Sequence, residues 1–416
     1  MKRILILGAG TAGTMVANRL VRRLDRKSWQ ITVVDRDDKH VYQPGLLFIP
    51  FGAYRGTDLV KPRKRFLPDG VDLVLGDIAR VDVAAGTVVL SDERELPFDE
   101  LIIATGVSPR PDQTPGMLGP QWRHSIFDFF TLEGATALRT ALENFDGGRL
   151  VVHITDMPIK CPVAPLEFAF LADAYFRRRG MRDRVEIVYV TPLPGAFTKP
   201  IAAAHLGTML DERKITVEPD FLVERIDDDA KALISYDERE VPFDLLVTVP
   251  LNMGADFVGR SGLGDELNLV PVDRHTFQST RHPHVFALGD ANDIPTSKAG
   301  SVAHFSVEVF TDDFCRHLAG EPMTGSFDGH ANCFIESGDG KGLLIDFNYD
   351  TEPLTGTYPL PIIGPFGLLR ENARNHWGKL AFRWIYWHLL LRGRRIPLPA
   401  HMSMAGKHQP AKEGQS

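Results

Sequence analysis

The stretch "RILILGAGTAG", residues 3–13, decides the fold of the N-terminal part of the chain. It begins as a continuous apolar run, which is typical of a buried strand in a parallel sheet. Glycines in the GxGxxG spacing follow at once, and "TMVANRLVRRL" then has the composition of a helix. A glycine turn between a strand and a helix lets the backbone approach a pyrophosphate, whose charge rests on the helix N-terminus. The loop residues predicted to bind this group are Gly8, Gly10, Thr11, Ala12 and Gly13.

The next apolar segment, "WQITVVD" at residues 29–35, reads as a second strand and ends in Asp35. An acid at this position of a dinucleotide-binding unit can accept hydrogen bonds from the hydroxyls of a ribose. A carboxylate would repel a 2'-phosphate, so Asp35 favours a ligand with a free 2'-hydroxyl.

The bulk composition limits the other classes of function. The chain has 416 residues, 44% of them hydrophobic, so more than one domain with a buried core is expected. The net charge of -7 gives no reason to expect a nucleic acid partner. No uninterrupted apolar run reaches about 18 residues, so a membrane-spanning helix is not expected. The 14 histidines show neither HxH nor HExxH spacing, and no metal site is predicted.

Two further strands end in motifs that select the ligand. "FDELIIATGVSPR" carries Ala104, Thr105 and Gly106, and "HPHVFALGDAND" carries Gly289 and Asp290. Both resemble the paired motifs of the two-dinucleotide-binding-domain flavoproteins, the glutathione-reductase-like superfamily. The resemblance implies bound FAD, with Asp290 on a ribityl hydroxyl. It also implies that Lys298 and the helix predicted after it approach the N1 edge of the flavin.

A second strand–loop–helix–strand unit runs from "RLVVHI" at residue 149 to "VEIVYVTP". Its first loop reads "TDMPIKCPVAP", with prolines and no glycine, so a backbone cradle for the pyrophosphate of NAD(P)H is disfavoured. The loop offers Cys161 instead, beside Lys160 and at the mouth of a helix. These neighbours predict a lowered thiol pKa and redox chemistry, while a small buried hydrophobe remains the alternative.

These motifs predict an α/β protein with two Rossmann-like domains and a C-terminal amphipathic membrane-binding segment. The FAD-binding domain is discontinuous. The predicted divisions are residues 1–110 with 271–320, then 111–270, then a quinone- and membrane-interaction region at 321–416.

Beyond the FAD motifs, the chain resembles the sulfide:quinone oxidoreductases and, more distantly, the flavocytochrome c sulfide dehydrogenases. The resemblance rests on "CPVAPLEF", which places Glu167 six residues after Cys161, and on Cys333 in "ANCFIESGDGKG". It implies a Cys161/Cys333 redox pair that oxidises sulfide, Glu167 as an acid/base group, and transfer of electrons through FAD to a membrane quinone. Whether the two cysteines lie close enough to pair is not decided by the sequence.

Other positions refine this resemblance. Many bacterial members have a flavin-linked cysteine where this chain has Phe127, in "RHSIFDFF", so the FAD is expected to be non-covalent. The resemblance also places Tyr42 and Pro44 near the flavin or quinone. Cys315, in a predicted helix, is expected to fill the core.

The C-terminal stretch "YPLPIIGPFGLLRENARNHWGKLAFRWIYWHLLLRGRRIPLP" combines aromatic and basic residues at helical spacing. This pattern predicts an amphipathic helix on a membrane surface, and thus a peripheral protein of a bacterial-type cytoplasmic membrane, its face undecided. The alternative is a helix packed on the core with a solvated basic face. A homo-oligomer is compatible with the sequence. The apolar stripe is Trp377, Leu380, Ala381, Trp384, Trp387 and Leu391, and the cations are Arg370, Arg374, Lys379, Arg383, Arg392, Arg394 and Arg395.

Three other functions stay open at this point. A type II NADH:quinone oxidoreductase would share the fold and the tail but needs the missing glycine loop. A flavocytochrome c-type sulfide dehydrogenase would use a haem partner instead of a quinone. A non-enzymatic flavoprotein could sense redox state through the two cysteines.

Overall fold

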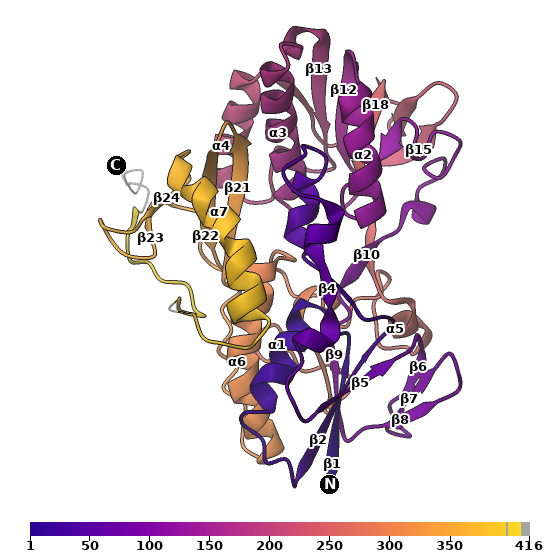
Figure 1. Ribbon diagram of the computed structural model, residues 1–416, viewed down its shortest axis with the longest axis vertical. Helices are drawn as coiled ribbons and strands as arrows, with labels where there is room; N and C mark the ends of the chain where they lie inside the picture. The colour runs from indigo at the N-terminus through magenta and orange to yellow at the C-terminus, as the bar shows by residue number, and fades with distance from the viewer. Residues whose placement is uncertain (397, 409–416) are drawn as a thin grey trace.

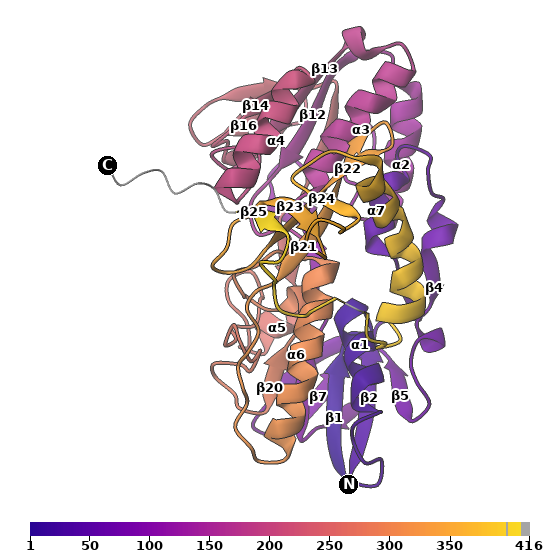
Figure 2. The ribbon, with the colours of Figure 1, turned by 90° about the vertical axis from the view of Figure 1, so that its left-hand side faces the viewer.

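The computed structural model describes residues 1–396 and 398–408. Two parallel five-stranded sheets lie toward opposite ends of an elongated molecule (Figure 1). A third five-stranded sheet, formed by the C-terminal region, and helix α7 lie along one side, across the region where the two halves meet (Figure 2). The predicted C-terminal region includes residues 397 and 409–416, which lie outside the described residues.

The first sheet has the strand order β20-β9-β1-β2-β5, and all its pairs are parallel. Strand β20 comes from far along the chain, so two separated stretches build one sheet. Helices α1 and α6 contact each other beside this sheet. The bounds are β1 (Lys2–Leu7), β2 (Trp29–Asp35), β5 (Val71–Leu75), β9 (Glu100–Ile103), β20 (Val285–Ala287), α1 (Thr11–Leu20) and α6 (Gly300–Leu318).

The second sheet has the order β11-β18-β12-β13-β14, again parallel. Its β12-α3-β13 unit follows the strand, loop, helix and strand expected from the sequence. Most of α3 is buried because the helix packs on this sheet and also against β21 of the C-terminal region. The bounds are β11 (Ile126–Phe127), β12 (Gly148–Ile154), β13 (Val185–Val190), β14 (Ile215–Glu218), β18 (Leu245–Val249), α2 (Leu132–Asn144), α3 (Ala164–Arg178) and α4 (Pro200–Glu212).

Short elements complete and connect the two halves. The antiparallel pair of β10 (Val107–Pro109) and β19 (Asn252–Gly254) forms a two-stranded link between the chain leaving the first sheet and the chain leaving the second. The remaining elements are β3 (Lys39–Val41), β4 (Val60–Pro62), β6 (Ile78–Asp82), β7 (Thr87–Leu90), β8 (Glu95–Pro97), β15 (Val223–Asp227), β16 (Ala232–Ser235), β17 (Glu240–Pro242) and α5 (Asp256–Arg260).

The C-terminal region forms a mixed sheet of order β21-β22-β24-β23-β25, with α7 packed on β21, β22 and β24. A π-helical turn, Tyr386–Leu390, extends α7. Among the described residues, no helix has the length and apolar character needed to cross a membrane. The bounds are β21 (Ala331–Gly338), β22 (Lys341–Phe347), β23 (Thr355–Tyr358), β24 (Phe366–Leu368), β25 (Lys407–His408) and α7 (Ala373–Ile385).

The predicted apolar stripe of this helix does not face one environment. Trp377 and Trp384 are exposed, but Trp387 and Leu391 are buried. The Trp387 ring stacks on Phe66 at a centroid distance of 5.0 Å. The expectation that Trp387 and Leu391 share a membrane-facing stripe is therefore wrong, because the chain after α7 folds back onto the half of the protein that contains the first sheet.

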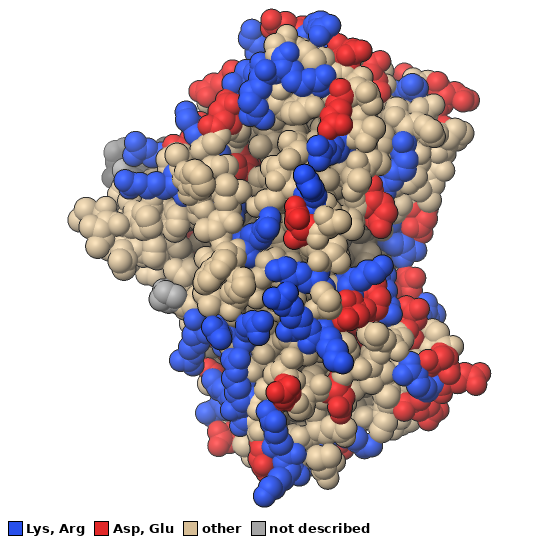
Figure 3. Space-filling view, viewed as in Figure 1, with Lys and Arg blue, Asp and Glu red and all other residues tan. Residues whose placement is uncertain are grey.

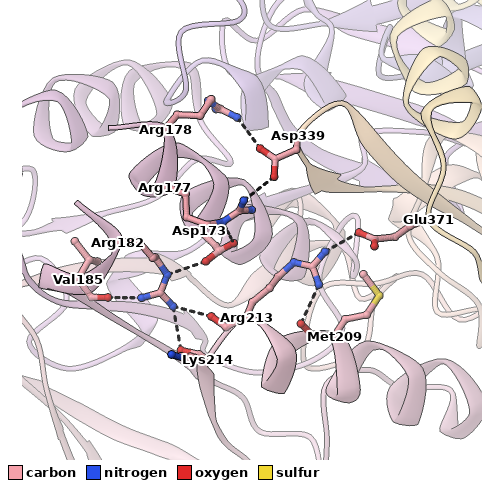
Figure 4. A network of polar contacts seen from close by, with 10 residues as sticks. All are labelled: Asp173, Arg177, Arg178, Arg182, Val185, Met209, Arg213, Lys214, Asp339 and Glu371. Atoms are coloured by element: carbon pink, nitrogen blue, oxygen red, sulfur yellow. Dashed lines mark hydrogen bonds and ion pairs between the residues drawn. The ribbon is translucent and has the colours of Figure 1, made fainter. Parts of the chain in front are cut away.

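A polar network attaches the C-terminal region to the second sheet domain (Figure 4). The Asp173 carboxylate, buried on α3, accepts hydrogen bonds from Arg177 at 2.9 Å and Arg182 at 2.7 Å. Arg177 also pairs with Asp339 of the β21–β22 turn at 2.8 Å. In the same network Arg213 reaches Glu371, which precedes α7, at 2.6 Å. The network thus fixes β21 and α7 relative to α3.

We predict that Asp173→Ala lowers the free energy of unfolding by about 3 kcal/mol, because it leaves the partly buried Arg182 guanidinium without its carboxylate. Chemical denaturation of the holoprotein measures this change. The matched control is Arg178→Ala, since Arg178 is exposed and 3.6 Å from Asp339. Its effect should stay below about 1 kcal/mol. Equal losses in the two variants would contradict a structural role for the buried carboxylate.

Candidate active site

The glycine loop after β1 has the geometry that the sequence predicts. Gly8 has a φ of +100°, and a Cβ added there would lie 2.5 Å from the Ala104 carbonyl oxygen. A Cβ at Gly13 would lie 1.9 Å from the Gly8 carbonyl oxygen. Gly10 is different, because its added Cβ would meet only the Ala104 carbonyl oxygen, at 4.0 Å. Gly8 and Gly13 therefore permit close packing of the loop, while Gly10 leaves open space in front of it.

A cavity lies in front of this loop and collects residues from all three regions of the chain. Several predicted site residues fall outside its lining, namely Gly8, Gly13, Asp35, Tyr42 and Cys333. Those that line it are Gly10, Thr11, Ala12, Pro44, Ala104, Thr105, Gly106, Cys161, Glu167, Gly289, Asp290 and Lys298.

Asp35 lies beside the loop and holds its backbone. Its carboxylate accepts a hydrogen bond from the Ala9 N–H at 2.7 Å and pairs with Arg63 at 3.1 Å. Burial raises the pKa of Asp35, and the Arg63 guanidinium opposes that shift. Arg63 belongs to the basic run "KPRKR", whose sequence alone suggested a solvated loop. The predicted contact of Asp35 with a ribose stays a prediction.

The second strand-end motif is held by a buried lysine. The Lys298 ammonium donates to the carbonyl oxygens of Asp290, at 3.0 Å, and Asn292, at 2.7 Å. Burial lowers the pKa of Lys298 and raises that of Asp290. Helix α6 begins two residues later at Gly300, and its N-cap residue Ala299 makes no side-chain capping bond. Because both residues line the cavity, the unpaired N–H groups of this helix end are placed to meet an anionic ligand.

The Cys161 loop of the second domain docks on this motif. The Cys161 N–H donates to the Lys298 carbonyl oxygen at 2.6 Å. Cys161 has a φ of +51°, a left-handed conformation that is uncommon outside glycine and often marks functional sites. The Lys160 ammonium points to the Gln43 side chain, 2.9 Å away. In a glycine-rich form, a loop at this place would bind a second dinucleotide. Here the loop presents the Cys161 thiol to the cavity of the first domain.

The predicted lowering of the Cys161 pKa is wrong for this structure. Burial raises the pKa of the Cys161 thiol well above its usual range, and the nearby Glu167 carboxylate adds to the shift. Helix α3 begins only at Ala164, so Cys161 lies before its first turn, and the Lys160 ammonium donates to Gln43 Oε1. The cation that lowers the thiol pKa is Lys379, from the C-terminal helix.

Cys333 lies on β21, buried, in the same electrostatic environment. Burial raises the pKa of its thiol to about 12, Glu167 again adds to the shift, and Lys379 opposes it. Cys333 is also among the groups that raise the pKa of Cys161. No disulfide joins them in this structure. Cys315 is half-buried on α6 and shares none of these neighbours.

An ion pair between Glu167 and Lys379 forms the centre of the cluster. The Glu167 side chain is buried, with 1% of its surface exposed, and the Lys379 side chain is largely buried, with 13% exposed. Glu167 Oε1 also accepts from the Glu336 N–H at 2.7 Å, and Lys379 donates to the Phe334 carbonyl oxygen at 3.1 Å. Glu167 Oε2 has no hydrogen-bond partner among the described residues. Burial raises the pKa of Glu167 to about 7, against the effect of Lys379, so the group can take up and release a proton near neutral pH.

The sequence analysis assigned Lys379 to the basic face of a membrane helix and missed its contact with the site. The sequence held one signal for this contact: Lys379 directly precedes Leu380, a residue of the predicted apolar stripe. Tyr386 was missed as well. Its hydroxyl lies 2.7 Å from His40 Nε2 and 2.8 Å from Thr11 Oγ1, so the end of α7 is bonded to the glycine loop. Tyr42 packs on Tyr386, with ring centroids 5.0 Å apart.

A glycine loop, two strand-end motifs and the Cys161 thiol around one cavity are the features of a flavin-dependent redox enzyme. Residues 2–306 match the family model described as "Pyridine nucleotide-disulphide oxidoreductase", and the chain belongs to this family. The Rossmann-type α/β fold expected from the sequence is confirmed. The open approach at Gly10 and the facing strand ends fit FAD, which family membership also supports.

Within the family, the chain is similar to sulfide:quinone oxidoreductases, which confirms the resemblance seen in the sequence. The mitochondrial enzyme of Mus musculus is 25% identical over 94% of this chain and 86% of its own length. That of Schizosaccharomyces pombe is 25% identical over 96% and 93%. The crystal structure of the Aquifex aeolicus sulfide:quinone oxidoreductase has the same fold, with a TM-score of 0.78, 18% identity, and coverage of 95% of this chain and 92% of that one.

We predict opposite shifts in thiol reactivity from the two partners of the ion pair. Glu167→Gln should move the alkylation profile of Cys161 to lower pH, because the carboxylate that raises the thiol pKa is lost. Lys379→Met should move it to higher pH, because the cation that lowers the pKa is lost. Iodoacetamide labelling across a pH series, read by peptide mass spectrometry, measures both. Arg374→Met, an exposed cation on the same helix, is the control and should match the wild type.

Proposed function

We propose that this protein oxidises sulfide at Cys161 and Cys333 and passes the electrons through FAD to a quinone. The observation that carries the proposal is the placement of Cys161 and Glu167 in the wall of one cavity. The glycine loop and the two strand-end motifs line the same cavity. Cys333 lies outside this wall and shares the Glu167 and Lys379 charges with Cys161. The similarity to proteins described as sulfide:quinone oxidoreductases supports the choice of donor and acceptor.

FAD would lie along Gly10 to Ala12, Ala104 to Gly106, and Gly289 with Asp290, and would supply a two-electron acceptor beside the thiols. We propose that it is held without a covalent bond. Among the described residues that line the cavity, Cys161 is the one cysteine, and Phe127 lies on β11 outside the lining. Asp290 and Lys298 would face its sugar chain and ring edge, and Asp35 its ribose.

The sulfur chemistry is thiol–disulfide exchange. When the two free thiols lose their protons and join as a Cys161–Cys333 bridge, two electrons are released, which bound FAD would accept. Hydrosulfide then attacks one sulfur of this bridge, the S–S bond breaks, and a persulfide and a thiolate form. Glu167, with its free Oε2, takes the proton of the hydrosulfide. Lys379 stabilises the thiolate. When the thiolate and the deprotonated persulfide join as a trisulfide, two electrons are released, which bound FAD would accept. The central atom of the trisulfide is the oxidised sulfide.

We predict that anaerobic sulfide bleaches the flavin absorbance of the wild type and that decylubiquinone restores it. Cys161→Ser and Cys333→Ser should each lose steady-state sulfide-dependent quinone reduction by at least about 10³-fold, because neither a bridge nor a persulfide can form. Cys315→Ser is the matched control and should keep wild-type activity. Retained turnover in either of the first two variants would contradict the two-cysteine relay.

The same assay separates the alternatives. Because residues 155–163 contain no glycine, NADH should leave the flavin oxidised where sulfide bleaches it. Bleaching by NADH alone would favour the NADH:quinone alternative. Reduction of a cytochrome without reduction of quinone would favour the flavocytochrome alternative, and sulfide reduction of the flavin without turnover would favour the redox sensor.

We further propose that the protein attaches peripherally to a membrane through α7 and the β23–β24 turn. Ile362 and Ile363 in this turn are 93% and 77% exposed, and Trp377 and Trp384 expose one side of α7. On its other side, α7 contributes Lys379, Phe382 and Tyr386 to the cavity. A lipid-soluble acceptor arriving at the exposed side of α7 would therefore be separated from the flavin site by this one helix.

Basic residues lie close to these apolar ones. Figure 3 shows Lys and Arg gathered over the region of α1, below a projection on the left that carries few charged residues. Arg22, just after α1, donates to the carbonyl oxygens of Arg392 and Gly393, which brings the two basic segments together. Cations beside exposed aromatic residues suit an anionic membrane surface.

We predict that the double variant Trp377→Ser, Trp384→Ser binds anionic vesicles roughly tenfold more weakly or worse, because burial of each large apolar side chain contributes about 1.5 to 3 kcal/mol. Co-sedimentation with liposomes measures the binding. The matched control is Tyr236→Ser, an exposed aromatic residue far from α7 in the second domain. Unchanged binding in the double variant would leave the helix as a core-packed element with a solvated basic face.

A further inference from the structure

A second cluster of chemically active side chains lies outside the cavity. It is at the N-terminal ends of strands β9 and β20, whereas the cavity lies at their C-terminal ends. Glu100 is the first residue of β9, His284 directly precedes β20, and His317 lies in the last turn of α6. His284 Nδ1 lies 3.0 Å from Glu100 Oε1, and His317 Nε2 lies 3.1 Å from Glu100 Oε2. One potential ligand atom from each residue lies within 4.8 Å of the others.

The surroundings fix each of the three groups. The backbone of His284 is bonded to β9, since its carbonyl oxygen accepts from the Leu101 N–H at 2.9 Å. The His317 ring packs against Phe286 and Phe314, with centroid distances of 5.2 and 6.1 Å. The Glu100 side chain is 9% exposed, and the two histidines are its side-chain partners among the described residues. The fold thus holds the Glu100 and His317 side chains in place and fixes the backbone of His284 beside them.

The donor set and spacing suit a divalent transition metal. Two imidazole nitrogens and one carboxylate are a common ligand set for zinc. Ligands about 2.0 to 2.1 Å from a tetrahedral ion lie about 3.4 Å from one another, close to the 3.0 and 3.1 Å seen between the imidazoles and the carboxylate. His284 is 61% exposed, so one side of the cluster is open to solvent for a water ligand and for entry of the ion.

We propose that Glu100, His284 and His317 bind a zinc-type divalent cation. The ion would join the start of two neighbouring strands to the end of α6. Strand β9 leads from Glu100 directly to Ala104 in the cavity lining, a distance of about 13 Å for four extended residues. The site is therefore separate from the redox cavity but shares with it both a strand and a helix, and a structural role follows: the cation fixes α6 on the sheet that presents the cavity residues.

No local motif reveals this site, because its ligands stand at positions 100, 284 and 317. The sequence-based expectation of no metal site rested on spacing within single segments. Only the parallel pairing of β9 with β20, and the return of α6 along the same sheet, bring the three residues together.

The test uses tag-free holoprotein that has been treated with a chelator and dialysed. Zn²⁺ is titrated by calorimetry, and Co²⁺ is followed by its visible absorption to the red of the flavin bands. We expect one bound ion per chain, a tetrahedral Co²⁺ spectrum, and a rise in Tm with added Zn²⁺. His284→Ala, whose side chain is largely exposed, should fold normally and weaken binding by roughly tenfold or more.

Two further variants complete the test. His317→Ala should weaken Zn²⁺ binding like His284→Ala, while His124→Ala, an exposed histidine elsewhere, should bind like the wild type. Flavin content and sulfide bleaching of the wild type without added metal serve as the reference for folding. The proposal is overturned if the wild type binds no stoichiometric ion, or if His284→Ala and His317→Ala both bind as the wild type does.

Discussion

The buried ion pair between Lys379 and Glu167 is the interaction on which the rest of the site depends. It joins α7 to α3, and the backbone groups of Glu336 and Phe334 join β21 to the same pair. Two buried charges are costly unless each is neutralised and hydrogen-bonded, so the three segments must assemble together. Their assembly places Cys161, before α3, and Cys333, on β21, in one environment. The pair also sets opposing effects on the thiol pKa values, with the carboxylate raising them and the ammonium lowering them.

The structure also explains how a nucleotide-binding unit can acquire a different use. The β12-α3-β13 unit keeps the fold of a dinucleotide-binding domain, but its first loop has prolines and a cysteine where glycines would be needed. The loop lies against the Lys298 backbone of the first domain, so the second domain contributes a thiol to the first domain's cavity. A fold alone does not determine a function, and here the loop chemistry decides it.

Helix α7 separates two environments. Trp377 and Trp384 lie on its exposed side, and Lys379, Phe382 and Tyr386 face the cavity. The hydrogen bonds of Tyr386 to His40 and Thr11 fix the end of the helix on the glycine loop. The same helix therefore closes the flavin site, supplies the cation of the thiol cluster and presents tryptophans to the outside.

The sequence by itself determined what depends on neighbouring residues. The glycine loop, the strand-end motifs and the β12-α3-β13 unit could be predicted because each is a local pattern of residues with a direct physical meaning. The loop residues Gly10, Thr11 and Ala12 were placed correctly beside the cavity for that reason. The tertiary structure alone decided the partners of the charged groups. Lys379 and Glu167 are 212 positions apart, and Glu100 and His317 are 217 apart. Helical spacing could not tell a lysine that faces lipid from one buried against a carboxylate, since both lie on an amphipathic helix. The thiol pKa was predicted with the wrong sign because burial outweighs the local charge of Lys160, and burial is a property of the assembled fold.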